Sequence, residues 1–364
     1  MSATRYHTLD HWRGLAALWV VFFHACALWE RPAAFPFTAL HDFGRLGWFG
    51  VHLFFVISGY CLAECGARAI TNKQSVPVFL LDRGCRIYPA YWAALLIAFA
   101  LALAATPFNH QPVFTAADAV GALPAGYGQV IADAALIAPW ASLQPYLLVS
   151  WTLTSEIAFY VLIALGIGLI RQVQRPAIAL LAGVFIALAQ ASHLLALPGT
   201  VLDLWPEFVC GLLAWVAVHS SRAKTSVTLL ATAGIGTLGL LGFILGSPSG
   251  TLPFAAAFAL LLLVLKRHDE SIARLRMLRF AGFLGALSYS LYLVHVPIIS
   301  PAQNLLHRLL PDAGRAFWIP LLLTALAVIP AWLFYLKIEQ PLESWRRRRF
   351  RPRIDSTTNP APGN

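Results

Sequence analysis

Two ionisable side chains stand eleven residues apart in WRGLAALWVVFFHACALW, the first apolar segment of the sequence. Arg13 lies near the start of this segment and His24 lies well inside it. Eleven residues make almost three turns of an α-helix, so the two side chains point the same way. A guanidinium can bind phosphate, and a neutral imidazole can act as a general base. The spacing therefore predicts an anion site and an acid–base site roughly 16 Å apart along one helix.

Two more ionisable residues, Glu156 and His295, lie within apolar segments far along the chain. Such residues are costly inside a membrane and usually serve a function. The helical rise places His24, Glu156 and His295 at a common depth, roughly 20 Å from the N-terminal side of the membrane. We therefore expect one polar chamber, to which Tyr292 and Ser288 contribute because they share the helix stripe of His295. The alternative is that each of these groups only satisfies a local hydrogen bond.

The segment FLLDRGCRIYPAYW, which precedes a predicted third span, adds two arginines. Arg83 and Arg86 are spaced i, i+3, so they share a helix face. Together with Arg13 they could bind the phosphates of a long, thin ligand, and coenzyme A has that outline. Asp10 lies one turn before Arg13 and could orient it. The alternative for Arg83 and Arg86 is that they only anchor the chain at the membrane surface.

The composition predicts a polytopic membrane protein made of α-helices. Of the 364 residues, 59% are hydrophobic and 12% are charged, and the mean hydropathy is +0.70. A soluble protein of this size needs a more polar surface. Apolar runs long enough to span a bilayer recur, and we expect ten spans: 12–29, 46–65, 87–106, 149–170, 176–193, 204–219, 227–246, 252–265, 282–300 and 317–338.

The net charge of +10 reflects membrane topology in this interpretation, not a nucleic-acid partner. With the N-terminus inside, every lysine and arginine except Arg31, Arg45, Arg308 and Arg315 lies on the cytoplasmic side, so both termini are expected in the cytoplasm. The expected domain covers residues 1–345, and residues 346–364 form a basic tail that is expected to be disordered. The five cysteines are scattered and show no metal-binding pattern, so no metal is expected.

The motifs resemble those of the acyltransferase family 3 membrane proteins, in family order, from about residue 5 to 345. They are LDHWRG, the Arg13-x10-His24 pair, GWFGVHLFFVISGY, FLLDRGCRIYPAYW, SWTLTSEIAFY, SYSLYLVHVP and the closing EQP. Trp12 stands where the family commonly has Leu. Many members carry an additional esterase-like domain, and none is expected here. Small stand-alone members often modify exopolysaccharide or lipopolysaccharide sugars, and xanthan-type exopolysaccharide acetyltransferases are similar in size and layout.

The resemblance implies a bundle of about ten helices in the bacterial inner membrane. Such a protein would move acetyl from cytoplasmic acetyl-CoA to a hydroxyl of a polyprenyl-linked or polymeric glycan outside. His24 and Glu156 would be catalytic, with Glu156 orienting the imidazole. Transfer could be direct or pass through an acyl-imidazole, and a larger acyl group could replace acetyl. The alternative function is a proton-coupled or lipid or glycan transporter with a His/Glu relay.

Overall fold

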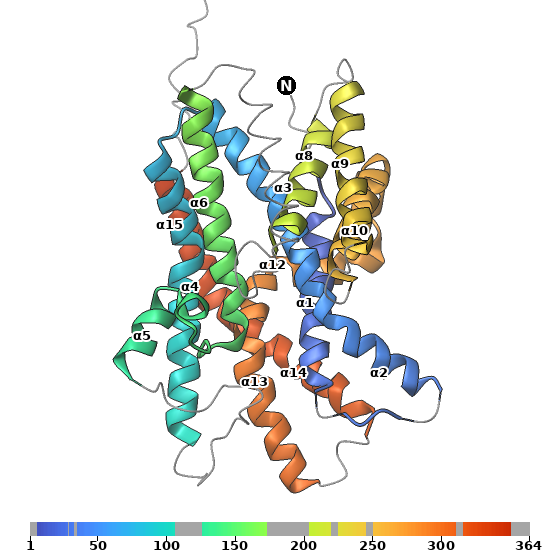
Figure 1. The fold of residues 1–364 in the computed structure, drawn as a ribbon. Helices are drawn as coiled ribbons and strands as arrows, with labels where there is room; N and C mark the ends of the chain where they lie inside the picture. The colour runs from blue at the N-terminus through green and yellow to red at the C-terminus, as the bar shows by residue number, and fades with distance from the viewer. Residues whose placement is uncertain are drawn as a thin grey trace, which may run out of the picture.

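The computed structural model is a bundle of α-helices, and no strand occurs among the residues that it describes. These residues are 6–27, 29–32, 35–105, 126–172, 204–219, 225–244, 250–310 and 316–350. The helices are α1 Leu9–Ala25, α2 Phe37–Arg45, α3 Phe49–Thr71, α4 Val76–Ala105, α5 Tyr127–Ala134, α6 Trp151–Gln172, α8 Trp205–His219, α9 Thr225–Ile244, α10 Thr251–Leu265, α11 Asp269–Ala273, α12 Arg279–Ala286, α13 Ser288–Leu309, α14 Trp318–Phe334 and α15 Gln340–Phe350 (Figure 1). The all-helical prediction is confirmed.

Helices occupy nine of the ten predicted spans, and the other span, 176–193, lies outside the described residues. Within the described parts of the chain, six helical segments are long and apolar enough to cross a membrane, or seven if the bent pair α12–α13 counts as one span. The short helices α1, with 17 residues, and α8, with 15, fall below that length. The membrane class therefore agrees with the sequence, while the count of ten spans and their orientation stay predictions.

Two predicted boundaries near the site are wrong. The third span was expected to begin at residue 87, but α4 begins at Val76, so Arg83 and Arg86 lie inside the helix. The ninth span was expected to be one helix, but it breaks at Leu287, where α12 and α13 meet at an angle of 76°. The apolar content of these segments indicated helices correctly, but it gave no sign of where each helix starts or bends.

The first helix lies inside the bundle and packs against α3, α12, α13 and α14. Its contact with α12 is very close, because a Cβ added to Gly14 would lie 2.2 Å from the carbonyl oxygen of Ala281, and one added to Gly285 would lie 1.9 Å from that of Asp10. Small residues permit such an approach of two helix backbones. Glycine at both positions therefore fixes the Asp10–Arg13 turn against α12.

The beginning of α1 is held by the carboxylate of Asp269, the first residue of α11. Asp269 accepts hydrogen bonds from the backbone N–H of His7 at 2.7 Å and of Thr8 at 2.9 Å, and from the Thr8 hydroxyl at 2.9 Å. The first N–H groups of a helix have no partner within the helix, and a carboxylate near them is stabilising. This contact fixes the N-terminal part of α1 beside α10 and α11.

The expected start of a disordered tail after residue 345 is wrong for residues 346–350. Helix α15 continues to Phe350, and Arg346 is buried. Its guanidinium forms ion pairs with Asp82 of α4 and with Glu343, the latter at 2.7 Å. Residues 351–364 lie outside the described residues. The basic run therefore begins as part of the folded bundle.

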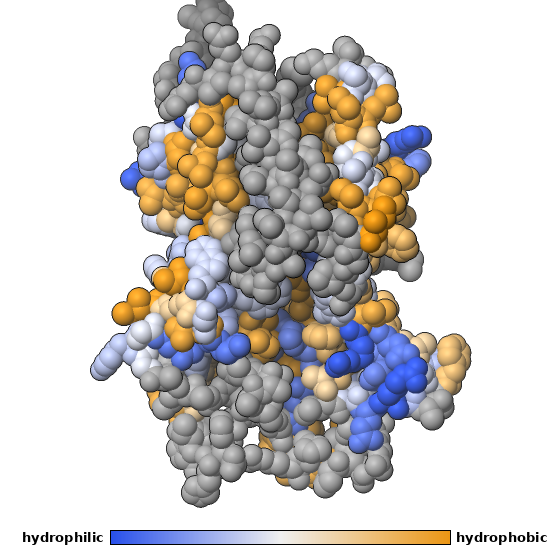
Figure 2. Space-filling model, viewed as in Figure 1, coloured by the Kyte–Doolittle hydropathy of each residue, from blue (hydrophilic) through white to orange (hydrophobic). Residues whose placement is uncertain are grey.

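The flanks of the bundle are apolar, as expected for surfaces that face lipid. Figure 2 shows hydrophobic surface over α4 and α6 on one side and over α9 and α10 on the other. Exposed large side chains on α9 include Leu229, Leu230, Leu240, Phe243 and Ile244. A continuous apolar surface of this kind is unusual on a soluble monomer.

Candidate active site

Six of the predicted site residues line one cavity of about 160 Å³ between α1, α3, α4, α6 and α13. We call it the arginine cavity. It brings together Arg13, Arg83, Arg86, Glu156, Ser288 and Tyr292. These residues come from four helices that lie far apart in sequence. The predicted chamber included Glu156, Ser288 and Tyr292, whereas the three arginines were expected in a separate anion site nearer the start of α1. The structure places both sets around one cavity.

A second cavity of about 380 Å³ adjoins the first, and we call it the α15 cavity. Arg13, Arg86 and Tyr289 line both cavities, so these three side chains form the boundary between them. The hydroxyl of Tyr289 donates to the carbonyl oxygen of Ile87 at 2.9 Å, which holds α13 against α4 at this boundary. Asp10 and Arg347 also line the α15 cavity. Two guanidinium groups therefore stand where the two cavities adjoin.

The three predicted arginines differ in their partners. Arg13 lies 3.5 Å from the carboxylate of Asp10, in agreement with the predicted orienting role of Asp10. Arg83 donates to Asp82 and, at 3.5 Å, to the sulfur of Cys65, so its guanidinium is already held by its own surroundings. Arg13 and Arg86, at the boundary of both cavities, are therefore better placed to meet an entering phosphate than Arg83 is.

Glu156 lies in the arginine cavity, where its Oε1 accepts a hydrogen bond from the Tyr160 hydroxyl at 2.6 Å. Tyr160 is one turn further along α6, on the same face of the helix. Attraction between Glu156 and Arg86 acts across the same cavity. The carboxylate thus balances the positive charge of the arginines, whereas the sequence analysis assigned it to the imidazole of His24.

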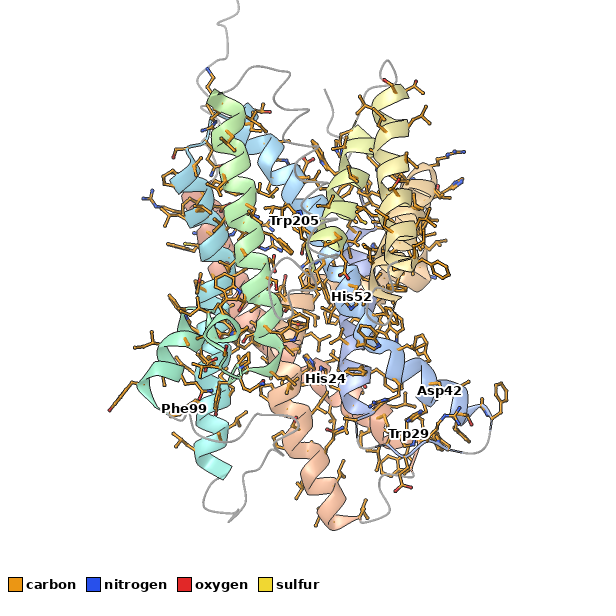
Figure 3. The ribbon with its side chains drawn as sticks, in the orientation of Figure 1. His24, Trp29, Asp42, His52, Phe99 and Trp205 are labelled. Carbon is orange, nitrogen blue, oxygen red and sulfur yellow. The ribbon has the colours of Figure 1, made fainter. Side chains whose placement is uncertain are left out.

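His24 and His295 lie side by side at the C-terminal end of α1. Their ring centroids are 5.1 Å apart, and Figure 3 shows His24 on the side of α1 that faces α13. The prediction placed His24 well inside a span, but it is the penultimate residue of α1, which ends at Ala25. Gln303 of α13 donates to the carbonyl oxygens of His24 and Ala25 at 3.0 Å each. The His24 carbonyl also accepts from the backbone N–H of Ala27 at 3.2 Å, so the Gln303 amide adds a tie between α13 and the last turn of α1.

A short polar row joins the histidines to the arginine cavity. The ring of His295 lies 5.9 Å from that of Tyr292, measured between centroids. The Tyr292 hydroxyl lies 2.8 Å from the Thr152 hydroxyl, and both residues line the arginine cavity. The expected single chamber is therefore two neighbouring parts: a cavity with Glu156 and the arginines, and a histidine pair just beyond Tyr292, in which His295 is buried and His24 is half-buried.

Ser288 has a structural contact in addition to its place on the cavity wall. It is the first residue of α13, and its hydroxyl donates to the carbonyl oxygen of Gly285 at 2.9 Å, across the bend from α12. The neighbouring Ser290 contacts Glu339 through both its hydroxyl and its backbone N–H, the latter at 3.1 Å. These contacts hold the bent segment in place between the two cavities.

The sequence analysis missed two contacts between polar side chains of different helices. His52 of α3 lies 2.7 Å from Glu207 of α8, and both side chains are buried. Asp82 contacts Arg83 and Arg346, as described above. The polar positions in otherwise apolar helices were the available signal, but their partners are separated by 155 and 264 residues. Spacing along one helix cannot identify partners at such separations.

Within the described segments, no group of three or more His, Cys, Asp and Glu side chains is arranged to hold a metal ion. All five cysteines are free thiols. The groups that the site offers for chemistry include imidazoles, carboxylates, phenols, hydroxyls, thiols and guanidinium groups. Such a set can bind a phosphorylated ligand and move a proton.

Comparison with known families identifies the class of this membrane protein. The model of the acyltransferase 3 family, described as an acyltransferase domain, matches residues 6–336. The chain therefore belongs to the acyltransferase 3 family, as the sequence motifs indicated. No solved structure matches it significantly.

Two similar proteins cover most of the chain. The exopolysaccharide production protein ExoZ of Rhizobium meliloti (strain 1021) is 30% identical over 316 residues, which is 83% of this chain and 91% of that protein. The acyltransferase MdmB of Streptomyces mycarofaciens is 26% identical over 366 residues, 89% of each chain. A third protein, protein 2 in the picA locus of Rhizobium radiobacter, is 34% identical over 94 residues, 26% of this chain and 44% of that protein.

Proposed function

We propose that this acyltransferase moves acetyl from cytoplasmic acetyl-CoA to a hydroxyl of a cell-surface or exopolysaccharide sugar on the other side of the bacterial inner membrane. The observation that carries the proposal is the pair of adjoining cavities, with Arg13 and Arg86 at their boundary and the histidine pair beyond. Similarity to an exopolysaccharide production protein supports a glycan acceptor, either polymeric or linked to a polyprenyl lipid.

Coenzyme A matches this arrangement of arginines and histidines, because its charged phosphates and its reactive thioester lie at opposite ends of the molecule. Its phosphates would bind Arg13 and Arg86, since guanidinium groups form paired hydrogen bonds with phosphate oxygens. Arg83 would add positive charge to the wall of the arginine cavity. The flexible arm would extend past Tyr292 and bring the thioester toward His24, about 16 Å along α1 from Arg13. Ser288 and Glu156 would line its way.

His24 acts as the general base in the proposed reaction. Its neutral imidazole takes the proton of the sugar hydroxyl while the hydroxyl oxygen bonds to the thioester carbonyl carbon. The carbon–sulfur bond then breaks, and the coenzyme A thiolate leaves with that proton. The products are the acetyl ester and free coenzyme A, and His24 returns to its neutral form. In the competing route, His24 first takes the acetyl group and releases coenzyme A, and the sugar hydroxyl then attacks the acetyl-imidazole and regenerates His24.

Mass spectrometry of the cell's glycans tests this function. Deleting the gene should remove acetyl, 42 mass units for each hydroxyl modified, from one class of surface glycan. The native gene should restore it, and His24→Ala should not, because general-base catalysis contributes about 10²- to 10⁴-fold. His268→Ala is the matched control, since His268 is an exposed histidine away from both cavities.

Two results would contradict the proposal. Glycans that are identical with and without the gene would exclude a role in acetylation. A missing glycan, present in neither acetylated nor free form, would instead favour the transporter alternative, because a transporter moves its cargo without modifying it.

A further inference from the structure

We propose that His295 is the positioning residue of this site and that it acts on His24 through its Nε2 atom. The inference rests on the proposed function, because it assigns a role within the same reaction. It also replaces the earlier assignment of this role to Glu156, whose carboxylate lies in the arginine cavity with Tyr160.

The hydrogen bonds of His295 determine which ring nitrogen carries the hydrogen. Its Nδ1 lies 3.0 Å from the carbonyl oxygen of Leu291 and 2.8 Å from that of Tyr292. A carbonyl oxygen can only accept a hydrogen bond, so Nδ1 must be the N–H donor. In the neutral ring, Nε2 is then an acceptor with a free lone pair.

The Nε2 atom is fully buried and has no hydrogen-bond partner among the described residues, and the His295 side chain as a whole is 0% exposed. A buried polar atom without a partner lowers stability, and a phenylalanine or leucine would fill the same space without that cost. The unpaired state of Nε2 is therefore best explained if this atom accepts a hydrogen bond during the reaction.

The ring of His24 packs against His295 from another helix, at 5.1 Å between centroids and tilted by 50°. On its own helix, His295 faces Tyr292, whose hydroxyl is engaged with Thr152 and with the carbonyl oxygen of Val149. Glu156 belongs to the cavity beyond Thr152. A small rotation of either imidazole would let an N–H of His24 donate to Nε2 of His295.

A hydrogen bond from His24 to Nε2 of His295 would orient the His24 imidazole, as the aspartate of a Ser-His-Asp triad orients its histidine. In neutral His24, it fixes the hydrogen on the nitrogen that faces His295 and leaves the other nitrogen free to take the hydroxyl proton. After that transfer, His24 carries two N–H groups, one of which donates to Nε2 while the other returns its proton to the thiolate. His295 neither gains nor loses a proton over the reaction.

Two amide variants separate the two nitrogens of His295. Counted in bonds from the backbone, the amide nitrogen of Asn matches Nδ1 and the terminal amide of Gln matches Nε2. His295→Asn therefore retains the donor to the carbonyl oxygens of Leu291 and Tyr292 but removes the acceptor, whereas His295→Gln places an amide oxygen where Nε2 lies. Both are measured as purified full-length protein in lipid, with acetyl-CoA and the glycan acceptor, per mole of protein that elutes as a single species.

The proposal predicts that His295→Asn lowers kcat at least about 10-fold, a part of the general-base contribution, and leaves KM for acetyl-CoA unchanged. His295→Gln should recover most of the lost kcat. A purely structural histidine would give the opposite pattern: wild-type kcat in His295→Asn and a low yield of folded His295→Gln. Wild-type kcat in His295→Asn overturns the proposal, and so does failure of a folded His295→Gln to recover activity.

Failure of the proposed function would look different. If the wild-type protein transfers no acetyl, or if His24→Ala keeps full activity, the base itself has been misassigned. If the wild type is active and His24→Ala is inactive, the two His295 variants alone decide the role of His295.

Discussion

Among single residues, Arg13 connects the two cavities with the helix of His24. It contacts Asp10, lines both cavities and lies on the same helix as His24. The sequence could predict this role because the spacing along one helix fixes which side chains share a face. It could not predict that Arg83 is held by Asp82, which in turn meets Arg346 from 264 residues away. The sequence likewise could not predict that Glu156 shares a cavity with the arginines and not with His24.

Removing the boundary arginines should weaken binding of the nucleotide part of the donor. We expect Arg13→Ala and Arg86→Ala each to raise KM for acetyl-CoA by about 10- to 100-fold, since a hydrogen bond to a charged group contributes about 1.5–3 kcal/mol. The kinetics are measured in lipid with purified protein. Acetyl-pantetheine, which lacks the nucleotide, should be used equally well by both variants and by the wild type.

Arg274→Ala is the matched control for this measurement, because Arg274 is an exposed residue whose partner, Glu270, is also exposed. An unchanged KM in Arg13→Ala and Arg86→Ala would show that these arginines do not bind the phosphates of the donor. An equal loss of activity with acetyl-pantetheine would point to a structural role for these arginines.

At the scale of elements, apolar runs predicted where helices lie but not how they are joined. Helix α4 begins at Val76, whereas the predicted span begins at residue 87, because the polar run Asp82–Arg86 interrupts the apolar pattern and marks the boundary of the prediction. The bend at Leu287 separates α12 from α13. It lies between Gly285, which touches α1, and Ser288, which caps the bend. These features arise from packing between helices, which one sequence does not show.

The contact between α1 and α12 gives a prediction about stability. Gly285→Ala places a methyl group 1.9 Å from the carbonyl oxygen of Asp10, so the two helices must move apart. We expect a loss of about 1–3 kcal/mol in stability, typical of overpacking, together with lower activity as Asp10 and Arg13 shift. Gly236→Ala is the control, because a Cβ there meets nothing within 4 Å.

Thermal unfolding of the detergent-solubilised protein compares the two variants. Alanine is a better helix former than glycine by about 1 kcal/mol, so Gly236→Ala should unfold at the same or a higher temperature. If Gly285→Ala were as stable as Gly236→Ala, the close packing of α1 against α12 would be wrong.

The last helix gives a second prediction at this scale. Arg346 is buried between Asp82 and Glu343, and removing one partner of a buried ion pair costs about 3–5 kcal/mol. Arg346→Ala should therefore lower the unfolding temperature and detach α15 from α4. Arg349→Ala, an exposed arginine of the same helix, should have little effect. Limited proteolysis should cut Arg346→Ala within α15, and equal resistance of the two variants would contradict the pairing.

At the scale of the whole molecule, the class of the protein was the most predictable feature. Composition and apolar runs indicated a helical membrane protein, and the motifs indicated its family. The distribution of lysine and arginine predicts cytoplasmic termini, which place the α15 cavity toward the donor. Reporter fusions at the C-terminus measure this orientation. A cytoplasmic fluorescent protein should be active there and a periplasmic phosphatase inactive, and the reverse result would invert the proposed direction of transfer.

Transfer across the membrane through His24 is the central claim, and sealed inside-out vesicles test it most directly. Radiolabelled acetyl-CoA is added outside these vesicles, where the cytoplasmic face is exposed, and a glycan acceptor is enclosed within them. The account predicts acetyl on the enclosed glycan in vesicles with the wild-type protein or His268→Ala, and none with His24→Ala. Labelled glycan in vesicles with His24→Ala, or labelling that occurs only when donor and acceptor share one compartment, would contradict it.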